Sequence, residues 1–187
     1  EGTAKNAFCA VRPPGHHANR MRGMGFCIFN NVAIAARYAQ KRYNIDRVLI
    51  ADWDVHHGNG TQDIFYEDNT VFFMSTHQSP WYPGTGKREE TGEGPGRGFT
   101  MNRPFPAGAG NKEIIGAFVN ELLPVPQSFL EGVVLRMADF QVIASFKIDG
   151  SCIGIEEFSH INHDSFQKDI DIFDLVDIQT DLCDQIY

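Results

Sequence analysis

The chain alternates short apolar runs with polar segments that are rich in glycine and proline. Two longer stretches have the spacing of helices: one begins at Asn30 or Asn31 and ends near Tyr43, and the other covers 112–123. Four apolar runs predict buried strands, at 7–11, 47–51, 70–75 and 140–145. Such an alternation is typical of an α/β domain.

Two regions depart from this pattern. Residues 79–110 carry many glycines and prolines and few apolar runs, which indicates a functional loop region rather than a linker. Residues 148–187 form a divergent segment with ten acidic residues against one basic residue, Lys168. Apolar residues persist among the acidic ones, so we expect an amphipathic helix whose acidic face is solvated.

Composition narrows the class of protein. At 187 residues and 42% hydrophobic content, the chain is long enough for one domain and too apolar to be disordered. The net charge of -8 argues against direct nucleic-acid binding, and no apolar run has the length of a membrane span. Four widely separated cysteines predict a reducing, intracellular location: the cytoplasm, or the nucleus in a eukaryote.

The strongest chemical motif runs from Asp52 to Gly60, directly after an apolar run. In α/β sheets, ligands bind at the carboxyl ends of parallel strands, and this segment follows such a strand. Asp54 and His56 are two residues apart, so an extended backbone would point both side chains the same way. A carboxylate oxygen beside an imidazole nitrogen suits zinc or iron(II). Glycines, Gly58 among them, allow a tight turn beneath the pair.

A second motif, Gly15-His16-His17, lies in a loop after the first predicted strand. Two adjacent imidazoles in such a loop are well placed to act as a general base and its electrostatic partner. A lone histidine is more often structural, and we interpret His77 in that way. The tandem pair, in a chain that also carries Asp54 and His56, favours a catalytic role.

Four segments together resemble the zinc-dependent histone deacetylase family, and most closely its class II and bacterial branch, which includes acetylpolyamine amidohydrolases. They occur in family order and spacing, within about residues 5–130: Arg12–Ala18, Gly25–Ala33, Asp52–Gly60 and Tyr82–Gly86. The resemblance implies an arginase/deacetylase-like α/β fold, with three layers around a central, mostly parallel sheet. Residues 1–187 would form a single catalytic domain.

The resemblance also implies roles for individual residues. His16 and His17 match the tandem histidines that orient and deprotonate a zinc-bound water. Asp52 matches the carboxylate behind the first histidine, and Asn59 stands where the second has an Asp or Asn partner.

Other matches concern the substrate and a monovalent cation. Gly25, Phe26 and Tyr82 match the walls of a narrow acyl-lysine tunnel. Asp52 and Ser75 match contacts to a buried K⁺ or Na⁺ ion, which would be structural.

Asp54 and His56 match two of the family's three zinc ligands. The third is an Asp at the end of a strand, and two alignments place it differently. One puts Lys147 there, and an ammonium group cannot bind zinc. Counting back from residues 161–166 gives Asp149 instead, and we take Asp149 as the third ligand of a single Zn²⁺.

Two parts of the family pattern have no counterpart. The N-terminal rim is missing, and so is a Gly-Gly-Tyr segment after residue 150, whose tyrosine stabilises the oxyanion; Tyr187 lacks that context. We therefore expect a piece of a longer protein. Losing an oxyanion donor costs on the order of 10²–10³ in kcat, so slow turnover is expected.

The implied reaction is zinc-dependent hydrolysis of an N-acetyl amide that releases acetate. The partner would be an acetylated lysine on a histone or another protein, or an acetylpolyamine. One alternative is an impaired domain that only binds acyl-lysine or a protein. A two-manganese ureohydrolase is disfavoured, since Gly58 stands where a second metal needs a carboxylate. The oligomeric state is not predicted.

Overall fold

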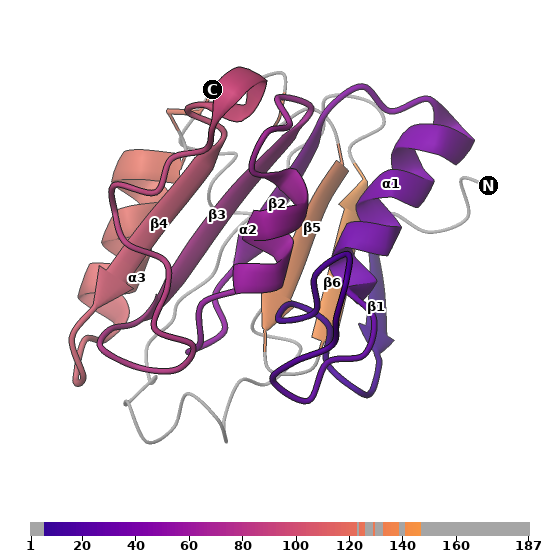
Figure 1. Ribbon diagram of the computed structural model, residues 1–187. Helices are drawn as coiled ribbons and strands as arrows, with labels where there is room; N and C mark the ends of the chain where they lie inside the picture. The colour runs from indigo at the N-terminus through magenta and orange to yellow at the C-terminus, as the bar shows by residue number, and fades with distance from the viewer. Residues whose placement is uncertain (1–5, 123, 126–128, 130–132, 139–140, 147–187) are drawn as a thin grey trace.

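The computed structural model describes residues 6–122, 124–125, 129, 133–138 and 141–146 (Figure 1). Asp149, Lys147 and the acidic segment 148–187 lie outside these described residues, so the predictions made for them stay predictions. The elements are β1 (Asn6–Ala10), α1 (Asn31–Tyr43), β2 (Val48–Asp52), α2 (Asn59–Phe65), β3 (Val71–Gln78), η1 (Gly94–Gly96), β4 (Thr100–Phe105), α3 (Asn111–Ala117), the π-helical turn η2 (Phe118–Leu122), β5 (Val133–Ala138) and β6 (Gln141–Phe146).

One sheet organises the described residues, in the strand order β1-β6-β5-β2-β3-β4. The neighbours β5, β2, β3 and β4 run parallel, whereas β6 is antiparallel to both β1 and β5. The mostly parallel sheet that we predicted is confirmed. Register places Asp52, the last residue of β2, beside Ser75 of β3.

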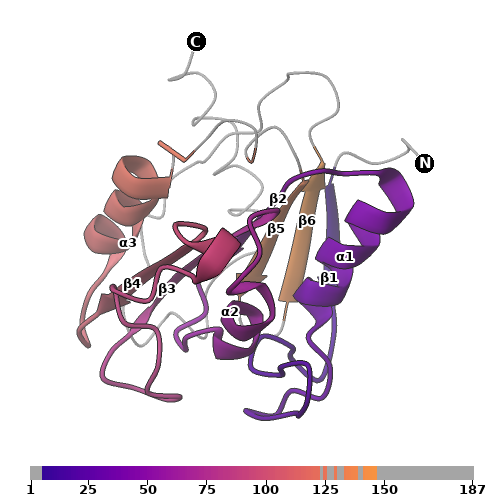
Figure 2. The same cartoon turned by 45° about the horizontal axis from the view of Figure 1, so that its top comes forward.

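Helices cover both faces of the sheet, which gives the three expected layers (Figures 1 and 2). Alternate residues of β2 point to opposite faces. Val48 and Ile50 pack with apolar residues of α1 and with Phe65 of α2. Leu49 and Ala51 pack in a second cluster with residues of α3 and η2. Because both faces are buried, β2 is apolar along its length until Asp52.

Three elements lie where none was expected. The helix α2 is seven residues long and begins after Gly58 without a side-chain cap, so it lacks the usual start signal. The strand β4 lies inside the region predicted as loop; it carries Pro104, which an edge strand tolerates. We also missed β5, although Val133-Val134-Leu135 is an apolar run that predicts a strand.

Candidate active site

The carboxyl end of β2 is where the predicted site residues meet. His16 belongs to the loop after β1, and its Nδ1 lies 2.8 Å from Oδ2 of Asp52. Both side chains are buried, and burial raises the pKa of Asp52 while the His16 ring counteracts part of that rise. The Asp52 carboxylate therefore accepts the Nδ1 hydrogen of His16 and leaves Nε2 turned toward Asp54, 3.9 Å from its Oδ1.

The second histidine of the tandem has its own partner. Nδ1 of His17 lies 2.8 Å from Oδ1 of Asn59, the first residue of α2. The two imidazole rings of His16 and His17 are tilted, with centroids 4.1 Å apart. Burial, and then the proximity of His16, lower the pKa of His17 to about 4. His17 is therefore neutral at pH 7, which is the form that can accept a proton.

Asp54 and His56 converge, although not as expected. Their backbone is a bend rather than an extended strand, so that part of the prediction is wrong. Oδ1 of Asp54 accepts the backbone N–H of His56 at 2.8 Å and lies 3.2 Å from its Nδ1, a turn that Asp favours. Burial opposes ionisation of Asp54, but hydrogen bonds from His56 and the proximity of His16 lower its pKa to about 2.

The glycines of this segment lie at a tight turn, and they also leave space for neighbouring groups. Gly58 has a φ of -76°, which other residues also adopt. A Cβ at Gly58 would lie 2.2 Å from Oδ2 of Asp52, and one at Gly60 would lie 2.3 Å from the carbonyl oxygen of Ala18. The predicted tight turn is confirmed, since the Asn59 N–H donates to the carbonyl oxygen of His57 at 2.9 Å across Gly58. The missing Cβ atoms also let α2 pack directly against the histidine loop.

The residues predicted to wall a tunnel surround the same histidines. The Tyr82 ring lies edge-on to His17, with centroids 5.0 Å apart, and to His56 at 5.9 Å. Gly25 has φ +55°, and a Cβ there would lie 2.3 Å from Cδ2 of His17. Phe26 follows with φ 62° and is 90% exposed, so it stands at the surface.

Trp81 is a further neighbour of the site. Its side chain is 55% exposed, and its indole N–H donates to Nε2 of His56 at 3.2 Å. Trp81 is thus a partly exposed residue in direct contact with His56.

Next to the site lies a polar network, buried in part, that the sequence interpretation missed. The Glu90 carboxylate can only accept, so Gln62 donates its amide N–H to it, at 2.6 Å. The Gln62 oxygen then accepts from Nε2 of His57 at 3.0 Å and from Asn102 at 2.7 Å. Nδ1 of His57 accepts from the Thr85 hydroxyl at 2.7 Å. Single amides and hydroxyls, scattered over forty positions, leave no spacing signal in a sequence.

His77 joins this network, as a structural histidine should. Its Nδ1 lies 3.0 Å from the Ser75 hydroxyl and its Nε2 lies 3.0 Å from the carbonyl oxygen of Gly86. Because a carbonyl only accepts, the hydrogen of the neutral ring is on Nε2, and Ser75 donates to Nδ1. Ser75 and Asp52 are adjacent in register, which is compatible with the predicted cation contact.

The metal prediction is supported by two donors. Among the residues described here, no group of three or more His, Cys, Asp or Glu side chains is arranged to hold a metal ion. Oδ1 of Asp54 and Nδ1 of His56 nevertheless face each other at 3.2 Å, an oxygen and nitrogen pair that suits zinc. These two residues fit the ion, and the proposed third ligand, Asp149, lies outside the described residues.

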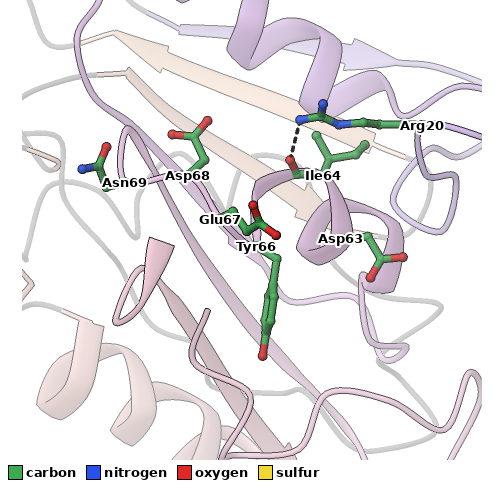
Figure 3. Close-up of a pocket in the computed structure, with 7 residues that line it drawn as sticks. All are labelled: Arg20, Asp63, Ile64, Tyr66, Glu67, Asp68 and Asn69. Atoms are coloured by element: carbon green, nitrogen blue, oxygen red, sulfur yellow. Dashed lines mark hydrogen bonds between the residues drawn. The ribbon is translucent and has the colours of Figure 1, made fainter. Parts of the chain in front are cut away.

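A separate pocket of about 450 Å³ lies at the end of α2 and contains none of these residues (Figure 3). Three of its seven lining residues are acidic, and Arg20 donates to the carbonyl oxygen of Ile64 at 3.0 Å. Asp68, one of its carboxylates, is already paired with Arg37.

Among the residues that the structure describes, no helix is long and apolar enough to cross a membrane.

Comparison with known proteins finds relatives that share much of this sequence. The chain is 50% identical over 137 residues to "Histone deacetylase 10, chloroplastic" of Oryza sativa subsp. japonica, covering 73% of this chain and 31% of that protein. It is 51% identical over 127 residues to a "Probable deacetylase" of Archaeoglobus fulgidus, covering 64% of this chain and 35% of the relative.

A solved structure described as "Crystal Structure of HDA15 HD domain" matches with a TM-score of 0.64 and 45% identity, covering 67% of this chain and 38% of that one. The chain thus spans about a third of the length of the relatives named here. A family model described as "Histone deacetylase domain" matches residues 1–173. With the paired histidines in place and nearly the whole chain matched, this protein belongs to the histone deacetylase domain family.

Proposed function

We propose that this chain carries the histidine pair and two zinc ligands of a deacetylase, an enzyme that hydrolyses the N-acetyl amide of a lysine side chain and releases acetate. The lysine belongs to a histone or another protein, or the amine is a polyamine. The observation that carries the proposal is the pairing of His16 with Asp52 and of His17 with Asn59 beside Asp54 and His56. The names of the relatives support the same chemistry.

The metal would be held by Asp54, His56 and Asp149. A zinc ion there supplies Lewis-acid polarisation of the acetyl carbonyl and makes water more acidic. The ordered carboxylate of Asp54, with a pKa lowered to about 2, is ionised at neutral pH and ready to bind a cation. We also propose that Asp52 and Ser75 contact a monovalent K⁺ or Na⁺ ion with a structural role.

His17 acts as the general base. Its Nδ1 hydrogen bonds to the Asn59 oxygen, so Nε2 carries the free lone pair and receives the proton of the attacking water. The imidazolium that results then returns a proton to the leaving amine. His16 is the electrostatic partner, because the Asp52 carboxylate stabilises a positive charge on its ring.

Tyr82, Gly25 and Phe26 form the substrate wall in this proposal. The Tyr82 ring lies edge-on to the rings of His17 and His56, so an acyl chain that passes Tyr82 reaches His17. Gly25 leaves no side chain between the wall and the His17 ring. We propose an intracellular setting, with no nucleic-acid or membrane partner.

Zinc content and turnover test the proposal together. Elemental analysis of the purified protein should find about one zinc per chain, and Asp54→Ala and Asp149→Ala should each lose it. Asp46→Ala, which removes an exposed acid, is the matched control and should keep it. Release of acetate from an acetyl-lysine peptide should accompany the zinc. Zinc without turnover of either an acetyl-lysine peptide or an acetylpolyamine would favour the binding-module alternative.

A further inference from the structure

The partner of His17 is an amide, and an amide can be turned either way. With its oxygen toward His17, Asn59 accepts a hydrogen from Nδ1 and leaves the Nε2 lone pair free. With its NH₂ group toward His17, it would need an unprotonated Nδ1, so the hydrogen of the neutral ring would sit on Nε2. An aspartate has no such second orientation, because both its oxygens accept. Something else near Asn59 must therefore select the orientation.

Met24 provides that selection. Its thioether sulfur lies 3.4 Å from Nδ2 of Asn59, on the side away from His17. A thioether sulfur accepts weakly and cannot donate. The NH₂ group of Asn59 is satisfied when it faces the sulfur, whereas the amide oxygen would meet another acceptor there.

The backbone holds the sulfur in this place. The carbonyl oxygen of Met24 accepts the N–H of Cys27 at 2.8 Å, which closes a tight turn. Within that turn Gly25, with φ +55°, lies directly against the His17 ring. The guanidinium of Arg22 also donates to the sulfur, at 3.7 Å, from the solvent side. Met24 is therefore anchored between the histidine and the surface.

We propose that Met24 is a positioning residue: its sulfur fixes the amide orientation of Asn59 and thereby keeps the hydrogen of His17 on Nδ1. The effect on turnover rests on the proposed function of His17 as base, but the effect on the tautomer does not. Met24 touches neither substrate nor reacting atoms and acts through Asn59 alone.

Met24→Leu tests the proposal, since it removes the acceptor and nearly conserves volume. In the metal-free protein, ¹⁵N chemical shifts of the His17 ring should report the Nδ1–H tautomer in the parent and a mixture of tautomers in Met24→Leu. Turnover should fall by up to about tenfold in kcat, with KM unchanged. Met21→Leu, at a 90% exposed methionine of the same loop, should change neither measurement.

The Asn59→Asp background makes the test specific. A carboxylate has no orientation to select, so Met24→Leu should lower kcat by less than about twofold there. Melting temperatures confirm that each variant folds, and Met24→Ala replaces Met24→Leu should the leucine disturb the loop. An unchanged His17 tautomer in the folded Met24 variant overturns the proposal, as does an equal loss of kcat in both backgrounds. A parent protein without turnover contradicts the proposed function only, because the tautomer measurement stands without it.

Discussion

Two pairs of histidines lie near the carboxyl ends of β2 and β3. They differ in which of their ring nitrogens are hydrogen-bonded. His16 and His17 pack with ring centroids 4.1 Å apart, and His57 and His77 with centroids 4.7 Å apart. Burial lowers the pKa of His17 and His77 to about 4 and that of His57 to about 3. Burial and pKa therefore do not separate His17 from His57 and His77.

Hydrogen bonding does separate them. Both ring nitrogens of His57 and of His77 are bonded to protein groups, which tie the loop around Thr85 and Gly86 to α2 and β3. In the described part of the chain, the His17 ring is bonded through Nδ1 alone. A buried neutral imidazole with one nitrogen left unused is able to act as the base that we propose, whereas one with both nitrogens bonded serves as a structural link.

Removing the ring of His17 should give the largest effect. We expect His17→Ala to lower kcat about 10²–10⁴-fold, because the general base is lost. The protein should also lose stability, because the ring is buried, but less than when a histidine bonded through both nitrogens is removed. Steady-state kinetics beside thermal unfolding would check this, and a rate within twofold of the parent would contradict the role of His17.

His57→Ala should reverse that pattern. Its ring is 1% exposed, and its loss leaves a cavity and removes the partners of Thr85 and Gln62. We expect unfolding to become easier by about 3 kcal/mol, measured by urea denaturation. Activity per folded molecule should fall less than in His17→Ala. A variant as stable as the parent would show that the buried network contributes little.

Acid should destabilise the protein through its buried neutral histidines, which are His57 and His77 together with His17. His57 and His77 have pKa values of about 3 and 4 when folded, against an ordinary histidine pKa of 6.5. Between those values the unfolded chain binds more protons, so stability is full above pH 6.5 and falls as the pH drops toward 4. Each histidine adds at most about 1.4 kcal/mol per pH unit.

Urea denaturation from pH 7.5 to 5 would measure this slope. His77→Gln keeps a donor for the Gly86 carbonyl but cannot titrate, so its stability should fall less steeply with acid. Equal slopes in the parent and the variant would show that His77 is not the source of the acid sensitivity.

The smallest effect is expected at Thr85. Thr85→Val removes the hydroxyl that donates to Nδ1 of His57 and should cost about 1 kcal/mol. Thr85→Ser keeps the hydroxyl and should stay close to the parent. Because Thr85 follows Tyr82 by three residues, KM should rise in the valine variant more than kcat falls. Valine and serine variants of equal stability would argue against this hydrogen bond.

Much of the fold was predictable because its signals are local. The apolar runs predicted β1, β2, β3 and β6 within a residue or a few, and the periodicity with Asn30 as cap predicted α1. The short α2 and the polar edge strand β4 were missed, since neither has a cap or an alternating pattern. Their stability comes from packing on the sheet, which no short window of sequence contains.

The site divides in the same way. The sequence alone shows the types and spacing of the motif residues, which are tandem histidines in one loop and Asp-x-His after a strand. These motifs were enough to indicate the family. Which nitrogen of each histidine is bonded was decided by partners far away in sequence: Asp52 is 36 positions from His16, and Asn59 is 42 from His17. The same holds for Met24, 35 positions from Asn59. Residue identity supplies an imidazole, but only the packing of loops on a parallel sheet decides which of its nitrogens is already used, because those bonds join segments that meet only in the folded chain.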